Sequence, residues 1–300
     1  MGRTKPFQTY DQQLHRLQER GLYVDDREWA LDWLARVNYY RLSGYWYPFR
    51  VVGDGRRLDE FRPGATFREV IDLYEFDERL RAAVLAAAAP IELSVRAFLG
   101  HGLGRLDVCA HLRPEVLGTL ARTGDDYRTW RARFDREVAS SREDFVMHHR
   151  ITYDGVLPVW AAVEVLDWGS LVRLLMMSPS PVQSEVAARF RLRAPQLVSW
   201  LRALNIVRNA CAHHGRLFNR VYSKRPKLPA PGLVPALDAI APVTNRAFGQ
   251  LSLLQYLRGA LELGPDADLI RVLGSWPATG QVPLTVTGAP DDWRSSPLWH

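Results

Sequence analysis

One long stretch with a helical period constrains this fold more than any other feature of the sequence. It runs from Thr66 to about Gly104, and its apolar residues recur every three or four positions. They are Val70, Leu73, Tyr74, Leu80, Val84, Leu85, Ile91, Val95 and Leu99. Pro90 lies inside the stretch, where it removes an amide hydrogen that a helix interior uses. The pattern therefore predicts a single long helix with a kink at Pro90.

The rest of the chain is also helical in pattern, so we expect an all-α fold. Proline, glycine and aspartate stand where such helices would begin or end. The expected helices cover residues 11–20, 27–38, 127–140, 158–177, 195–214 and 243–263. A polar loop is expected from Val52 to about Pro63, and no segment has a strand pattern strong enough to build a sheet.

Composition and the residues that interrupt helices divide the chain into three expected segments. A hydrophobic content of 47% and 10 Trp predict a globular protein with an ample core. Residues 1–62 form an N-terminal helical, aromatic-rich segment, and residues 63–263 a helical domain. Residues 264–300 form a short helix and an irregular tail, whose tryptophans indicate that parts of it dock on the remaining structure.

The sequence lacks the usual signs of export or membrane insertion. Its longest apolar run, Ala82–Ile91, contains a proline and is too short to span a bilayer. The N-terminus has no apolar signal core. Cys109 and Cys211 lie far apart and form no CxxC pair, which is typical of reduced thiols. We therefore expect a cytoplasmic protein without membrane association.

Positive charge is concentrated in one window that contains no acidic residue. Between Glu185 and Asp238, 52 residues include ten Lys or Arg and no Asp or Glu. The net charge is +6 for the whole chain and −4 for everything outside the window. Such a field predicts a polyanionic partner. The alternative is a basic surface that only keeps the protein soluble.

The window contains the sequence RNACAHHGRLFNR at residues 208–220, called the motif below. Asn209 and His213 lie four residues apart and so share a helix face, towards which the long Arg208 side chain can curl. Histidine exchanges protons near neutral pH, and arginine binds phosphate oxygens. Such a set suits a phosphodiester, and RNA supplies its own 2′-hydroxyl nucleophile. The Arg–His spacing alone is common in so arginine-rich a chain.

Six blocks occur in a characteristic order along the chain. They are ERGLYVDD (19–26), VNYYRLSGYWYPFR (37–50), LYEFDERLR (73–81), IELSVR (91–96), LPVWAAVEVLDWGSL (157–171) and the motif (208–220). Together they resemble the Abi-like family, abortive-infection proteins of the AbiD and AbiF kind within the HEPN superfamily of helical, often RNA-cleaving domains. The resemblance implies a HEPN-like bundle with an N-terminal helical extension. It also implies an active site on Arg208 and His213, with Asn209 as a polar partner, and a homodimer whose two motifs face one cleft.

Further residues are assigned supporting roles. His214 ranks second as a general acid–base. Glu92 and Arg96 either form an intrahelical ion pair or, as the resemblance implies, support Arg208 or His213. Cys211 is expected to be a small packing residue rather than a nucleophile. The residues expected to bind RNA are Arg202, Arg216, Asn219, Arg220 and Lys224, together with Tyr40 and Arg41, for which core packing is the alternative.

Two functional hypotheses follow from these observations. The first is a metal-independent endoribonuclease of an abortive-infection system that cleaves RNA through 2′-hydroxyl attack, with no cofactor and no metal site. The second is a non-catalytic module that sequesters a structured or small regulatory RNA. A mixed case is also open, in which a partner RNA or a phage component restrains a nuclease, so a regulatory RNA or a phage-derived trigger is a further candidate partner.

Overall fold

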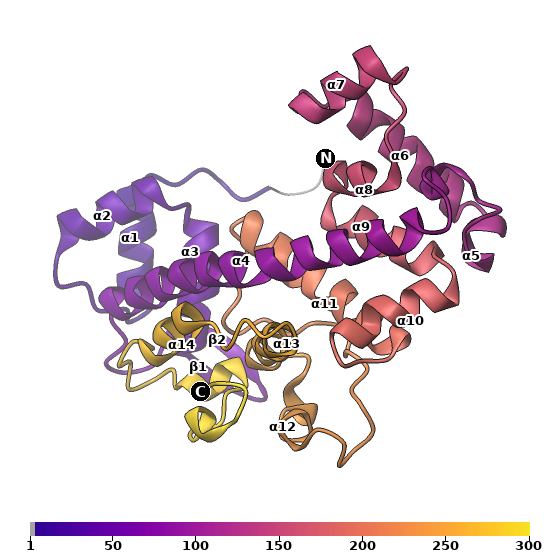
Figure 1. The fold of residues 1–300 in the computed structure, drawn as a ribbon. Helices are drawn as coiled ribbons and strands as arrows, with labels where there is room; N and C mark the ends of the chain where they lie inside the picture. The colour runs from indigo at the N-terminus through magenta and orange to yellow at the C-terminus, as the bar shows by residue number, and fades with distance from the viewer. Residues whose placement is uncertain (1–3) are drawn as a thin grey trace.

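The predicted long helix forms the centre of the fold. In the computed structural model, which describes residues 4–300, α4 runs without interruption from Phe67 to Gly104 (Figure 1). Its first turn is capped reciprocally. The Thr66 hydroxyl accepts the amide hydrogen of Glu69, and the Glu69 carboxylate accepts the amide hydrogen of Thr66. This capping box explains why the helix begins where its apolar period begins.

Three short helices lie at one end of α4. They are α1 (Tyr10–Glu19), α2 (Arg27–Arg36) and α3 (Tyr39–Trp46). Gly21 follows α1 with a φ of 90°, which glycine adopts without strain. Asp26 caps α2 by accepting the amide hydrogen of Trp29. Both helices therefore match the predicted boundaries to within two residues.

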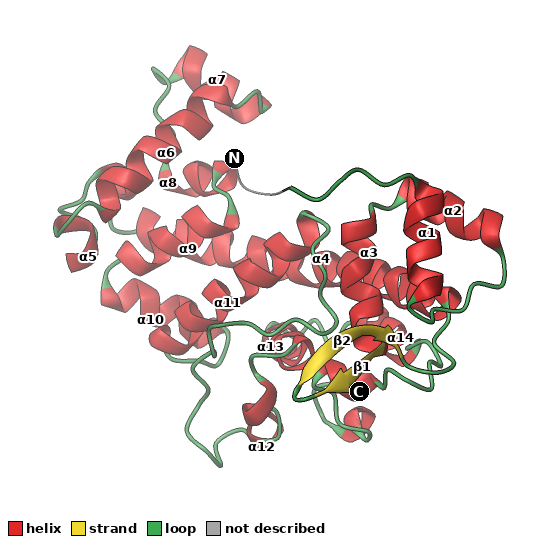
Figure 2. Cartoon of the chain, turned by 180° about the vertical axis from the view of Figure 1, so that it is seen from behind, coloured by secondary structure: helices red, strands yellow, loops and turns green. Residues whose placement is uncertain are grey.

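The segment expected to be a polar loop contains a small β-hairpin (Figure 2). Strands β1 (Arg50–Gly53) and β2 (Arg56–Phe61) pair antiparallel. Asp54 and Gly55 join them, and both have positive φ values, as a two-residue hairpin turn requires. The loop prediction was wrong here because the Asp–Gly signal was not used. The all-α class is confirmed, since this hairpin is the one sheet in the described chain and the other regular elements are helices.

An arm of helices projects from the opposite end of α4 (Figure 1). It consists of α5 (Thr119–Arg122), α6 (Asp126–Ser140) and α7 (Asp144–Thr152). The single helix predicted over residues 158–177 is wrong. The chain forms α8 (Val159–Ala162) and α9 (Trp168–Met177) instead. Asp167 accepts the amide hydrogen of Ser170 and thereby starts a new helix.

The remaining helices pack along the side of α4, except the short α12, which lies beyond α13 (Figure 1). They are α10 (Ser180–Arg189), α11 (Ala194–Ala212), α12 (Pro235–Asp238), α13 (Ala247–Ala260) and α14 (Ala267–Gly274). The irregular tail docks on them as predicted. Trp299 is 2% exposed and stacks on Phe248 with ring centroids 5.2 Å apart. One continuous core thus includes residues from all three predicted segments, among them Leu14, Val84 and Trp299.

Among the described residues, α4 is the one helix long and apolar enough to cross a membrane by length and composition. It contacts α3, α8, α10, α11, α13 and α14. The central helix of a soluble protein meets the same criterion, because its apolar residues face other helices. The arrangement is therefore compatible with a soluble protein.

Candidate functional site

The motif lies where α11 ends. His213 is the C-terminal cap, and His214 has a φ of 55°, in the left-handed region. The amide of Gly215 donates to the Ala210 carbonyl at 2.6 Å, and that of His214 donates to Cys211 at 3.1 Å. This is the Schellman pattern, in which glycine usually takes the left-handed position. Placing a histidine there strains the backbone and turns the chain sharply away from the helix axis.

A pocket of about 590 Å³ lies between this turn and α3. We call it the histidine pocket. The turn contributes His213, His214, Gly215, Arg216 and Arg220; α3 and its cap contribute Asn38, Tyr40, Arg41, Gly44 and Tyr45. These lining residues include no Asp or Glu. The pocket therefore combines two imidazoles with three guanidinium groups and has a positive electrostatic potential.

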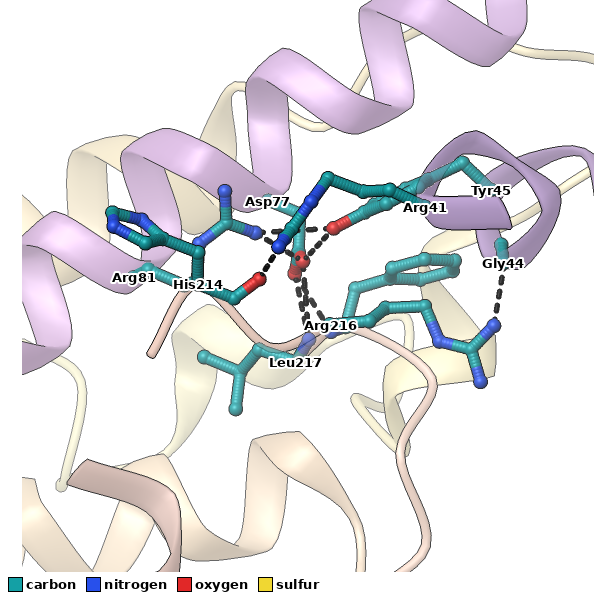
Figure 3. Close-up of polar contacts among 9 residues, drawn as sticks. Arg41, Gly44, Tyr45, Asp77, Arg81, His214, Arg216 and Leu217 are labelled. Atoms are coloured by element: carbon teal, nitrogen blue, oxygen red, sulfur yellow. Dashed lines mark hydrogen bonds and ion pairs between the residues drawn. The ribbon is translucent and has the colours of Figure 1, made fainter. Parts of the chain in front are cut away.

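Two arginines join the pocket walls across more than 170 residues of sequence (Figure 3). Arg41 donates to the backbone carbonyl of His214, and Arg216 donates to the carbonyl of Gly44 at 2.6 Å. A Cβ at position 44 would lie 2.8 Å from the Arg216 guanidinium, so a side chain there would displace Arg216 from this position. Each arginine uses one nitrogen in its bond and retains further N–H donors for an anionic ligand.

Beneath the pocket, the buried carboxylate of Asp77 holds these segments together (Figure 3). It accepts hydrogen bonds from the Tyr45 hydroxyl at 2.7 Å and from Arg81 at 2.8 Å. It also accepts the amide hydrogens of Leu217 at 3.0 Å and Phe218 at 2.8 Å. One side chain of α4 therefore fixes both α3 and the backbone that follows the two histidines.

Burial is the largest influence on the pKa values of Asp77 and Tyr45 in this cluster. It raises the pKa of Asp77, whereas Arg81, Tyr45 and the two backbone amides act in the opposite direction. Burial, followed by the charge of Asp77, raises the pKa of Tyr45, which keeps its hydroxyl protonated and donating. All these groups are occupied with one another, so the cluster positions the pocket and is not free to bind a ligand.

The sequence analysis missed Asp77, although a signal for it was present. The buried face of α4 includes Leu73, Leu80 and Val84, and Asp77 lies in the same helical register. A carboxylate in an apolar stripe costs free energy unless it has partners. Arg81, four residues later, is one of these partners. A charged pair on the core face of the longest helix thus indicates a buried polar network.

The structure brings six of the thirteen predicted site residues together around the histidine pocket, but it does not bring Arg208 and Asn209 into it. Arg208 is half-buried on the last turns of α11 and makes only a long contact of 3.5 Å with the Asn209 side chain. Of the residues predicted to bind RNA, Tyr40, Arg41, Arg216 and Arg220 line the histidine pocket. Arg202, Asn219 and Lys224 are not among its lining residues.

Other candidate residues have structural roles in this chain. Glu92 forms the intrahelical ion pair with Arg96 at 2.5 Å, and Arg96 also donates to the carbonyls of Val163 and Glu164. This pair ties α4 to the short turn after α8. Cys211 is 2% exposed, and burial raises the pKa of its thiol to about 12, which agrees with a packing role. Within residues 4–300, no three His, Cys, Asp or Glu residues cluster closely enough to hold a metal ion.

Comparison with known proteins gives one match. The model of a family described as Abi-like protein matches residues 32–219, which include α3, α4 and the motif as far as Asn219. No curated protein and no solved structure matches the chain. The matched region contains the Asp77 cluster and all the residues that line the histidine pocket except Arg220.

Proposed function

The chain belongs to the Abi-like protein family, and from that premise we propose that it is a metal-independent endoribonuclease of HEPN type that acts in abortive infection. The histidine pocket is the observation that carries this proposal. It places two exposed imidazoles beside three arginines, without an acid to neutralise them. Such a set is suited to bind a phosphodiester and to move protons at it. Cytoplasmic RNA would be the substrate.

In the proposed reaction, the 2′-hydroxyl oxygen attacks the adjacent phosphorus and the bond from phosphorus to the 5′-oxygen breaks. His213 accepts the proton of the 2′-hydroxyl as the general base. A protonated His214 donates a proton to the departing 5′-oxygen. The products are a 2′,3′-cyclic phosphate and a 5′-hydroxyl end. Arg41, Arg216 and Arg220 bind the phosphate oxygens and stabilise the charge that develops on them.

We assign Arg208 and Asn209 to the histidine pocket of a second protomer. They lie on the same helix end as His213 but outside its pocket. We propose a homodimer in which the motifs of two protomers face one cleft, so that Arg208 and Asn209 of one protomer complete the site of the other. This division of the motif would make activity depend on dimerisation.

The first experiment is cleavage of total and transfer RNA in EDTA by purified protein. The His213→Ala variant should cleave roughly 100- to 10,000-fold more slowly than wild type, because it lacks the general base. His148→Ala is the matched control, because His148 is also exposed but lies on α7. Cyclic-phosphate ends should appear with wild type and the control alone. A folded His213→Ala protein with full activity would refute the assignment.

Mixing two inactive variants tests the shared site. If Arg208 acts across the dimer, Arg208→Ala mixed with His213→Ala forms heterodimers that each retain one intact site. Random pairing then restores about a quarter of wild-type activity. If both residues act within one protomer, the mixture stays inactive. A monomer in light scattering at the assay concentration would also contradict the shared site.

The non-catalytic alternative is supported by one observation, the position of Arg208 outside the pocket of its own protomer. A sequestration module would bind a structured or small regulatory RNA through the same arginines. Its affinity would fall steeply with salt, because phosphate contacts release counterions. His213→Ala would leave this affinity unchanged, and no cleavage product would form with or without infected-cell extract.

A further inference from the structure

A second, larger cavity adjoins the histidine pocket across α3. Its volume is about 1260 Å³, and Asn38 and Tyr40 line both spaces. We call it the N-terminal groove. One wall is the segment from Lys5 to Thr9, which precedes α1, and the other is the face of α3 and the following turn that carries Tyr40, Ser43 and Tyr47. A ligand that leaves the histidine pocket over Tyr40 enters this groove directly.

Two tyrosine rings in the groove are open to solvent. Tyr40 is 65% exposed and Tyr47 is 47% exposed. They lie seven residues apart, which is two helical turns, so both face the same side and are separated by roughly 10 Å along the axis. Cations lie near both rings. The Lys5 ammonium is 5.6 Å from the centre of Tyr40, and the Arg50 guanidinium is 5.9 Å from that of Tyr47.

The charge of the groove is strongly positive, although it lies outside the acid-free window of the sequence. Its lining includes five basic side chains and a single acid, Asp59. Asp59 is already paired with two of the bases, Arg20 at 2.7 Å and Arg50 at 3.1 Å. The remaining bases are Lys5, Arg16 and Arg36, of which Arg36 pairs with Asp32 of α2 at 2.8 Å. Elsewhere outside the window the chain is mildly acidic, so this local excess is a specific feature of the groove.

We propose that the N-terminal groove binds the single-stranded nucleotides that flank the cleaved phosphate. Their bases stack on Tyr40 and Tyr47, and their phosphates follow the basic side chains. Spaced aromatic rings interleaved with cations are how proteins hold single strands without reading a sequence. An acidic peptide would use the charge but not the two open ring faces. The identity of the ligand as RNA rests on the proposed function, whereas the groove and its continuity with the pocket do not.

The test measures binding separately from cleavage. Fluorescent 2′-O-methyl RNA oligonucleotides lack the nucleophile, so their affinity can be followed by anisotropy without turnover. Tyr47→Ala should bind a twelve-nucleotide strand roughly 5- to 100-fold more weakly than wild type, as loss of a base–aromatic stack predicts. Tyr47→Phe should retain the affinity because it keeps the ring. Tyr153→Ala is the control, since Tyr153 is 56% exposed and lies directly after α7, on the arm.

The outcomes distinguish this inference from the proposed function. Equal affinity of wild type and Tyr47→Ala for the twelve-nucleotide strand would refute RNA binding in the N-terminal groove, whether or not the protein cleaves RNA. Displacement of the strand by poly-glutamate at the same charge concentration would also overturn it, because charge alone would then explain binding. Tyr47-dependent binding by a protein that never cleaves RNA would support the groove and contradict the nuclease. A dinucleotide, too short to reach Tyr47, should bind wild type and Tyr47→Ala alike.

Discussion

His111 is a fully buried imidazole whose two ring nitrogens have no hydrogen-bond partner in the structure. It packs edge-on against Phe134 with ring centroids 5.1 Å apart. Burial lowers its pKa from 6.5 to about 4, because an apolar site disfavours the imidazolium. Between these two pH values the unfolded chain binds a proton that the folded protein does not bind. Stability contributed by neutral His111 is therefore present above pH 6.5 and is lost as pH falls to about 4.

We predict that the free energy of unfolding decreases by about 3 kcal/mol from this residue alone between pH 7 and pH 4. Urea denaturation at several pH values measures it. His111→Leu should flatten the dependence by that amount, because the substitution removes the titrating group. Parallel pH profiles for His111→Leu and wild type would contradict the prediction.

At the scale of the element, α13 offers two glycines with opposite expected effects. A Cβ at Gly249 would overlap the carbonyl oxygen of Val243, whereas a Cβ at Gly259 would meet nothing within 4 Å. Gly249→Ala should lower the free energy of unfolding by about 1–3 kcal/mol through overpacking. Gly259→Ala should raise it by up to about 1 kcal/mol, because alanine favours the helix. Thermal stability of Gly249→Ala equal to or above that of wild type would contradict the close packing of Gly249.

The elements that the sequence predicted well are those with local causes. The apolar period and the capping residues lie within α4 and α1 themselves, so their boundaries could be inferred. The single helix predicted over residues 158–177 is wrong because of another local signal. Its apolar residues continue through Leu166, but the Asp167 cap, a local signal that the period does not reveal, divides it into two helices. The β-hairpin was missed in the same way. The Asp54–Gly55 turn favours paired strands even though the surrounding residues are polar.

At the scale of the whole molecule, a substitution in the C-terminal tail measures how much this distant segment stabilises the core. Trp299 is buried, stacks on Phe248 and donates its indole hydrogen to the Ser252 hydroxyl at 3.1 Å. Trp299→Ala should therefore reduce the free energy of unfolding by about 3–5 kcal/mol. Trp160→Ala, at a tryptophan that is 52% exposed, should cost far less. Similar melting temperatures for the two variants would show that the tail does not stabilise the core.

The candidate site could be predicted only in part, because it forms between distant segments. The acid-free window and the histidines located the turn after α11, and the aromatic block pointed to Tyr40 and Arg41. The sequence did not show that α3 and this turn face each other, nor that Asp77 joins them. The Tyr45–Asp77 bond spans 32 residues, and the bonds from Leu217 to Asp77 and from Arg216 to Gly44 span 140 and 172, separations that neither periodicity nor charge can report.

The hydrogen-bonded Asp77 cluster also determines when the histidine pocket can form during protein synthesis. Leu217 lies 140 residues after Asp77 in the chain. A ribosome that adds 5–20 residues per second needs roughly 7–28 s to extend the chain from one to the other. During that interval α3 and the first half of α4 have left the ribosome, while Arg41 and Gly44 still lack their partners across the pocket. A nascent chain of this protein therefore carries no assembled histidine pocket, and the host cell meets the complete site only after most of the polypeptide has been made.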